Sequence, residues 1–411
     1  MKPSTKTWID IADRPSLHLF NPGYEPGLLP GRKRYMAPKN VCRMREELAL
    51  LPLWYAEEDD YVWIEHSGSL DFLTGLPAEC FRRATPVSRR DWEGETPLPP
   101  LQAAPWGLSP QTLRMLEELS EVPGRDLFVP SWQETYATLA KRQTAALCLD
   151  KMRQQATRLL PETPCFLSSM EELEEYITTH TPPFVLKMPL SSSGRGLLRL
   201  DDTIPEKEGE WIRGALRKQG GISIEKRFQK VRDFALEYRL DASGGIVYHG
   251  ISFFETAGWK TYCGNLLAGQ AEMEEQVAML VGKEAFEEIK AITPEVLQEV
   301  FGGVYTGYLG VDMMVYADEQ GDFHIHPCVE INMRYTMGLV AIRLFERLID
   351  PSAKGVFRVV YEKNAFRRHQ EMEHSFPLKW KSGRILSGYL PLTPVISSTR
   401  YRAFVLISPS R

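Results

Sequence analysis

The chain has 411 residues, more than a single hydrophobic core usually serves, so two or three packed lobes are expected. Hydrophobic residues make up 43% and charged residues 25%, as in ordinary soluble globular proteins, and the formal net charge of -5 gives no basic footprint for a nucleic-acid partner. No apolar run could span a bilayer, and the polar start lacks a signal-peptide core. Six scattered cysteines without C-x-x-C spacing argue against disulfides or zinc. A cytoplasmic protein is therefore expected.

The N-terminal part alternates between predicted strands and helices. The sequence predicts strands at 17–20 and 61–65 and helices at 43–51 and 70–83. This alternation indicates an α/β lobe. The stretch 93–110 is crowded with prolines and predicts a break between lobes.

The rest of the chain is predicted to be helical at first and then rich in strands. Helices are predicted at 111–119, 131–140, 144–160, 171–178, 271–291, 294–301 and 339–348. Strands are predicted at 184–188, 197–200, 222–228, 234–241, 246–255, 310–317, 323–333, 384–391 and 400–407. Mixed elements of this kind are typical of an α/β (α+β) protein.

The first chemical pattern is a strand that ends in Lys187 and runs into a loop of serines and glycines at 191–196. Backbone amides in such a loop can surround phosphate oxygens. Lys187 would add a point charge and Arg195 a planar fork of donors. The loop is not a Walker loop, because no Gly-Lys-Ser/Thr follows its glycines. By itself, the pattern fits a flexible hairpin with an exposed lysine equally well.

The second pattern is a hairpin whose last strand carries Glu330, Asn332 and Arg334 at alternate positions. Alternate residues of a strand point to the same face, and the residues between them are apolar. Carboxylate and amide oxygens are the ligands that magnesium prefers. A solvated polar face is the alternative, and the apolar residues facing the other way make it the weaker one.

The register of this hairpin can be estimated from its turn. If Tyr316 lies opposite His324, then Asp312 lies opposite Cys328 and diagonal to Glu330. Diagonal neighbours are within side-chain reach of each other. The hairpin thus predicts two carboxylates and an amide on one face.

The third pattern, Glu225-Lys226-Arg227-Phe228 followed by Asp233, is weaker. Strand ends of this kind can offer backbone groups to an adenine ring and an acid to ribose hydroxyls. Glu225 and Asp233 could equally be plain surface charges.

Taken in chain order, these segments resemble the ATP-grasp superfamily over roughly residues 139–338. The resemblance implies an ATP-grasp fold that follows an N-terminal α/β lobe similar to the domain preceding it in that family. The expected divisions are an N-terminal domain at 1–125, a central subdomain at 126–222, a magnesium-binding subdomain at 223–360 and a C-terminal extension at 361–411.

The resemblance also implies roles for particular residues. Asp312, Glu330 and Asn332 would hold magnesium, and Arg334, Lys187 and Arg195 would act on the transferring phosphate. The implied ATP-binding residues are Lys141, Lys187, Ser191, Ser192, Ser193, Gly194, Arg195, Gly196, Glu225, Lys226, Phe228, Asp233 and Lys260.

The implied activity is that of a carboxylate–amine ligase that uses ATP and Mg²⁺. ATP would phosphorylate a carboxylate, and an amine or similar nucleophile would displace the phosphate. The expected partners are small-molecule carboxylates and amines, with a homodimer as a possible assembly and with neither nucleic acid nor membrane. A kinase on the same fold and a non-catalytic nucleotide-binding regulatory protein stay open as alternatives. Acceptor-site candidates are the loop 21–25 and the stretch 261–265, although 21–23 is equally well explained as a structural turn.

Overall fold

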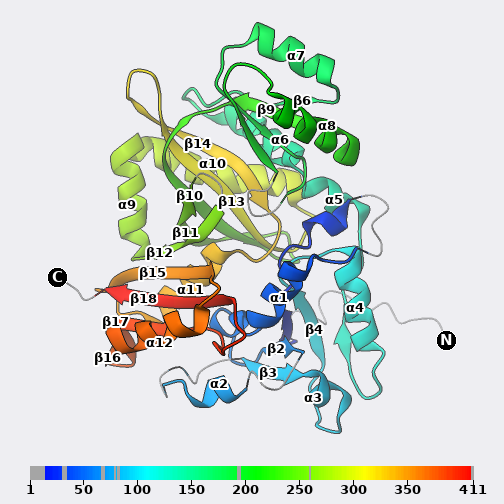
Figure 1. Ribbon diagram of the computed structural model, residues 1–411, viewed down its shortest axis with the longest axis vertical. Coiled ribbons are helices and arrows are strands. Elements are labelled where there is room, and N and C mark those ends of the chain that lie inside the picture. The colour runs from blue at the N-terminus through cyan, green and yellow to red at the C-terminus, as the bar shows by residue number, and fades with distance from the viewer. Residues whose placement is uncertain are drawn as a thin grey trace.

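The computed structural model describes residues 14–29, 35–65, 70–77, 80, 84–191, 196–258 and 261–408. Its strands form three sheets, of five, four and nine strands. In Figure 1 the four-stranded sheet lies at the top, the larger sheet below it, and the five-stranded sheet at the lower right. The predicted α/β fold class is confirmed.

The five-stranded sheet is parallel and has the order β3-β2-β1-β4-β5. Its strands are β1 (Ser16–Leu19), β2 (Tyr61–Ile64), β3 (Thr85–Ser88), β4 (Leu101–Pro105) and β5 (Leu127–Phe128). The α-helices of this lobe are α1 (Lys39–Glu47), α2 (Asp71–Thr74), α3 (Arg89–Glu93) and α4 (Pro110–Ser120). The strand order reverses between β1 and β4, and open sheets of this type bind ligands beyond the carboxyl ends of the strands at such a point.

Two predictions for this lobe were wrong. The proline-rich stretch contains β4, which lies between β1 and β5. Leu101 is fully buried in the core of the sheet, and Pro105 is the last residue of the strand, where a missing N–H is tolerated. The helix predicted at 70–83 ends at Thr74 and turns at Gly75, and residues 78–79 and 81–83 lie outside the described residues.

The four-stranded sheet is antiparallel and has the order β6-β9-β7-β8. Its strands are β6 (Cys165–Leu167), β7 (Phe184–Lys187), β8 (Leu197–Leu200) and β9 (Ile222–Lys226). Helices α7 (Met170–Thr179) and α8 (Glu206–Gln219) cover it, as Figure 1 shows. Leu173 and Ile212, from these helices, share a core with Leu186 and Ile224 of the sheet.

The nine-stranded sheet has the order β14-β13-β10-β11-β12-β15-β18-β17-β16. Its strands are β10 (Gln229–Leu240), β11 (Ile246–Ala257), β12 (Thr261–Leu267), β13 (Gly307–Ala317), β14 (Phe323–Asn332), β15 (Lys354–Tyr361), β16 (Lys379–Lys381), β17 (Arg384–Pro391) and β18 (Tyr401–Ser408). The accompanying helices are α5 (Glu134–Leu139), α6 (Arg142–Gln155), α9 (Gln270–Val281), α10 (Lys283–Phe301), α11 (Met337–Leu348) and α12 (Ala365–Ser375). The apolar face of β10, β11, β13 and β14 packs against α6, α9 and α10, which leaves the opposite face of these strands for polar residues.

The helical pattern 271–301 breaks at a different residue than predicted. The sequence favours a break near Pro294, but α10 runs through Pro294 without ending. Gly282, at φ 88°, separates α9 from α10. Glycine adopts this left-handed conformation at no steric cost, which is why the chain turns there.

The predicted domain boundaries stay predictions. The proposed boundary at 360 falls inside β15, and the strands beyond it continue the same sheet. Among the described residues, no helix is long and apolar enough to cross a membrane.

Candidate functional site

Asp312 and Glu330 lie directly opposite each other on β13 and β14. The predicted pairing of Tyr316 with His324 is confirmed, but the predicted pairing of Asp312 with Cys328 is wrong. A β-bulge between the two positions shifts the register, which brings the carboxylates together. The thiol of Cys328 instead belongs to the core on the other side of the sheet.

Asn332 and Arg334 extend this polar face beyond the carboxylates. Arg334 Nη2 donates to Asn332 Oδ1 at 2.8 Å, and Nη1 donates to the backbone oxygen of Tyr335 at 3.1 Å. Arg334 Nε lies 3.3 Å from Oε1 of Glu25, a residue of the loop after β1. The guanidinium is therefore fixed between the two lobes.

Arg142, at the start of α6, is a site residue that the sequence did not reveal. Its Nη2 lies 3.1 Å from Glu330 Oε2 and 3.4 Å from Ser191 Oγ, and its Nε donates to the backbone oxygen of Met188 at 3.1 Å. The resemblance had pointed to Lys141, the residue before it, which occupies the N-cap position of α6 without a side-chain capping hydrogen bond. A single-residue offset of this kind carries no signal in the sequence, since both residues are basic.

Lys187 and Glu225 form a buried ion pair between the neighbouring strands β7 and β9. Only 8% and 11% of their side chains are exposed. The charge of Lys187 acts on His326 and on Cys328 of β14. The structure thus places the predicted lysine strand near the predicted metal hairpin.

The serine–glycine loop is described only at its ends. The backbone N–H of Met188 donates to the oxygen of Gly196 at 2.8 Å, which closes the base of the loop. A Cβ atom at Gly196 would lie 2.3 Å from the Cβ of Ser191, so glycine is required there. Ser192, Ser193, Gly194 and Arg195 lie outside the described residues, as does Lys260.

Aromatic residues line the same region near the predicted adenine segment. The ring of Phe228 lies 4.2 Å from that of Tyr316 and 6.0 Å from that of His326. Burial lowers the pKa of His326 to about 4, so its ring is neutral at pH 7. Asp233 forms an ion pair with Lys230, and burial raises the pKa of Asp233. An aromatic cluster beside a carboxylate can accept a nucleoside.

The electrostatics of Asp312 test whether the site suits a cation. Burial and the neighbouring charges of Glu330 and Glu237 raise the pKa of Asp312 well above its usual range. Two opposed carboxylates and an amide oxygen are hard donors of the kind that magnesium takes, and a divalent ion would remove their repulsion. No three His, Cys, Asp or Glu residues gather in a metal-binding arrangement within the described residues. The set therefore fits magnesium only with an amide, phosphates and water completing the coordination.

Glu237 of β10 is a second residue that the sequence did not reveal. It is 3% exposed, and it accepts hydrogen bonds from Thr336 at 2.8 Å and Ser252 at 3.2 Å. Burial raises its pKa to about 7. Because Thr336 also caps α11, Glu237 ties the segment after Arg334 to the sheet.

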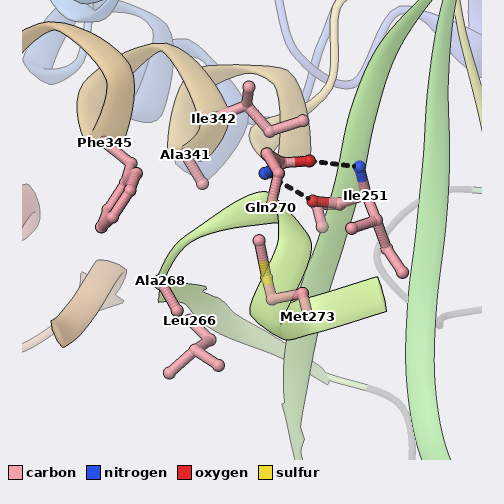
Figure 2. A pocket seen from close by; sticks show the side chains of 9 residues that line it. Ile251, Leu266, Ala268, Gln270, Met273, Ala341, Ile342 and Phe345 are labelled. Atoms are coloured by element: carbon pink, nitrogen blue, oxygen red, sulfur yellow. Dashed lines mark hydrogen bonds between the residues drawn. The ribbon is translucent and has the colours of Figure 1, made fainter. Parts of the chain in front are cut away.

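A small hollow lies beyond Ser252, between β11, α9 and α11, and Figure 2 shows its lining. The Gln270 amide accepts from Ile251 N at 2.7 Å and donates to Ile251 O at 3.1 Å. Apolar side chains surround the pair, and the hollow has no room for a water molecule. Gln270 thus satisfies the backbone of Ile251 beside the irregular pairing at Gly250.

No family model matches the sequence, and no curated protein matches it significantly. Among solved structures, a biotin carboxylase complex with β-γ-ATP from Campylobacter jejuni is similar at 11% identity over 86% of this chain and 82% of that chain, with a TM-score of 0.49. An N5-carboxyaminoimidazole synthetase complexed with ADP, from Staphylococcus aureus, is similar at 12% identity over 96% and 93%, with a TM-score of 0.47. The biotin carboxylase domain of a 2-oxoglutarate carboxylase from Hydrogenobacter thermophilus, in complex with MgADP, ADP and bicarbonate, is similar at 13% identity. The similarity covers 85% of this chain and 81% of that chain, with a TM-score of 0.49.

Proposed function

We propose that the protein is an ATP-dependent ligase that activates a carboxylate as an acyl phosphate and passes it to an amine or a similar nucleophile. The observation that supports this most is the direct opposition of Asp312 and Glu330 beside Asn332. Arg142 pairs with Glu330, the charge of Arg334 acts on Asp312, and Lys187 acts on Cys328 of the same hairpin. Acids for a metal, with cations for phosphates around them, suit the movement of a phosphoryl group.

Magnesium, when bound, would neutralise charge on the triphosphate. Asp312, Glu330 and Asn332 are the residues proposed to hold it. Lys187 and Arg334 would supply fixed positive charge where negative charge develops on the transferring group. Phe228 and Tyr316 would cover the adenine, with Glu225 and Asp233 near the nucleoside.

The N-terminal lobe would bring the substrates to this centre. Glu25 of that lobe already reaches Arg334 at 3.3 Å, which supports the loop 21–25 as part of the acceptor site. Asn21 has a structural role, because it is buried and bonds to Gly107 and Thr112.

The proposal is tested by incubating the protein with ATP, magnesium, pooled small carboxylates and pooled amino acids. A ligase releases free phosphate and ADP and produces a new mass equal to an amide. A kinase would leave the phosphate on the substrate. If the protein neither bound nor consumed the nucleotide, both the ligase and the kinase activity would be contradicted.

A further inference from the structure

The loop after β1 carries a carboxylate to the end of β14. The backbone N–H of Tyr335 donates to the oxygen of Trp106 at 3.1 Å, and the hydroxyl of Tyr24 donates to the oxygen of Met333 at 3.3 Å. These contacts hold the end of β14 against the carboxyl ends of β1 and β4. That edge, where the parallel sheet changes direction, is where open sheets bind their ligands.

Glu25 has one satisfied and one unsatisfied oxygen at this edge. Oε1 lies 3.3 Å from Arg334 Nε. Oε2 is buried and has no hydrogen-bond partner among the described residues, and only 12% of the side chain is exposed. An unpaired buried carboxylate oxygen costs free energy, and such groups in folded proteins normally have a donor. A donor from a bound molecule would remove that cost.

The neighbouring charges restrict what that donor can be. Glu330 and Glu25 interact unfavourably, and Arg334 is the only cation among the groups that influence Glu25 most strongly. A second carboxylate at Oε2 would therefore be repelled. A neutral primary amine supplies N–H donors and a lone pair, and it adds no negative charge beside the carboxylates.

We propose that Glu25 Oε2 binds the amine of the nucleophilic substrate and accepts its proton during ligation. This rests on the ligase function proposed above. The amine nitrogen would bond to the acyl carbon while the carbon–oxygen bond to phosphate breaks. The phosphate leaves with the electron pair of that bond, and the amine proton moves to Glu25 Oε2. No oxidant or further reactant is required.

The test compares two nucleophiles with the wild type and with Glu25→Gln. Hydroxylamine attacks acyl phosphates without help from a protein base, so hydroxamate formation reports the acyl phosphate itself. Pooled amino acids as nucleophiles report the amine site. Both reactions contain ATP, magnesium and pooled aliphatic carboxylates. We expect Glu25→Gln to lower amide formation by about a hundredfold, as for loss of a general base, and to change hydroxamate formation by less than about threefold.

A matched control is Glu58→Gln, which removes an exposed carboxylate from the same lobe and should change neither rate. The melting temperature of each variant checks folding, and Glu25→Asp should recover part of the amide rate. Equal loss of both products in Glu25→Gln would mean that Glu25 only positions Arg334 and would overturn the proposal. An unchanged amide rate would overturn it as well.

Two outcomes in the wild type separate this proposal from the proposed function. Hydroxamate without amide from any amine would overturn the amine site and leave carboxylate activation standing. Neither product from any carboxylate would overturn the ligase function, and the amine site with it.

Discussion

Asp312 and Glu330 repel each other, and this repulsion destabilises the folded state. A bound cation would remove the repulsion. We expect Glu330→Gln to weaken ATP binding in magnesium and to lower turnover by at least roughly 10–100-fold. That is the loss typical when a residue that only hydrogen-bonds to a metal ligand is replaced. Stability should change by only about 1 kcal/mol, since Glu330 is 32% exposed and its pair with Arg142 is partly solvated.

The matched control for that variant is Glu371→Gln. It breaks ion pairs with Arg367 and Arg368 in α12, in which Glu371 is 41% exposed. Calorimetry with ATP and thermal unfolding should show no change there. If Glu330→Gln bound Mg–ATP as tightly as the wild type, the hairpin would be a structural feature only.

The buried carboxyl group of Glu237 should make the stability of the fold depend on pH. Its pKa in the folded state is raised to about 7, so its neutral form is favoured by folding. Its contribution to stability is therefore complete below the unfolded pKa of about 4.3 and is lost as pH rises through about 7. Glu237→Gln should remove that loss. Urea unfolding measures the free energy of unfolding of both proteins, and the variant's excess over the wild type should grow by up to about 3 kcal/mol between about pH 5 and about pH 8. A constant difference between the two proteins across this range would contradict the assignment.

At single residues, the sequence predicted best where alternation along one strand decides the face. Glu330 and Asn332 lie on a shared polar face because strand geometry requires it. Arg142 was not identified, since it reaches Glu330 from a segment more than a hundred residues away. Glu25 was placed in the candidate acceptor loop 21–25, but its pairing with the distant Arg334 was not predicted. No local pattern records such a long-range approach.

Among the elements, the hairpin β13–β14 depends on its bulge. The register predicted from the turn holds at Tyr316 and fails after Met314, where the ladder shifts. Pro327 lies in the shifted stretch and has no N–H to donate to a regular ladder. Proline was visible in the sequence, but the number of residues that a bulge absorbs was not.

The loop between β7 and β8 gives an element-scale prediction. Gly196→Ala places a methyl group 2.3 Å from Ser191 Cβ, so the base of the loop must open. We expect weaker ATP binding by calorimetry, with little loss of global stability, because the four-stranded core lies elsewhere.

Gly214→Ala is the matched control, since a Cβ there meets no atom within 4 Å inside α8. That change should stabilise the helix by about 0.5–1 kcal/mol and leave ATP affinity unchanged. Equal ATP affinity in the two variants would mean that the loop takes no part in nucleotide binding.

Across the elements, several short strands were predicted as well as the longer segments, whereas β3, β4 and β5 of the N-terminal sheet were not predicted. Helix α4 and strands β17 and β18 lie within a residue or two of their predicted positions. Strand β4 was missed because its prolines outweighed its apolar residues, while its burial in the finished sheet depends on partners distant in sequence.

At the scale of the whole molecule, the N-terminal lobe and the C-terminal strands share one core. Leu51 and Trp54 pack with Leu344 and Phe357, and the indole of Trp54 donates to the oxygen of Leu392 at 2.7 Å. We therefore expect a fragment of residues 1–125 to expose this apolar surface and to remain unfolded or aggregate. A well-dispersed NMR spectrum of the isolated fragment would contradict this.

The three sheets converge on the centre formed by Asp312, Glu330, Lys187 and Arg334, and the proposed function requires that centre to bind a nucleotide together with a metal. Calorimetric titration of the whole protein with ATP, with magnesium and then with a chelator in its place, tests this most directly. We expect ATP to bind much more tightly in magnesium, because the ion would offset the negative charge of the triphosphate and of the opposed carboxylates. Equal affinity under the two conditions, or no binding in either, would contradict it.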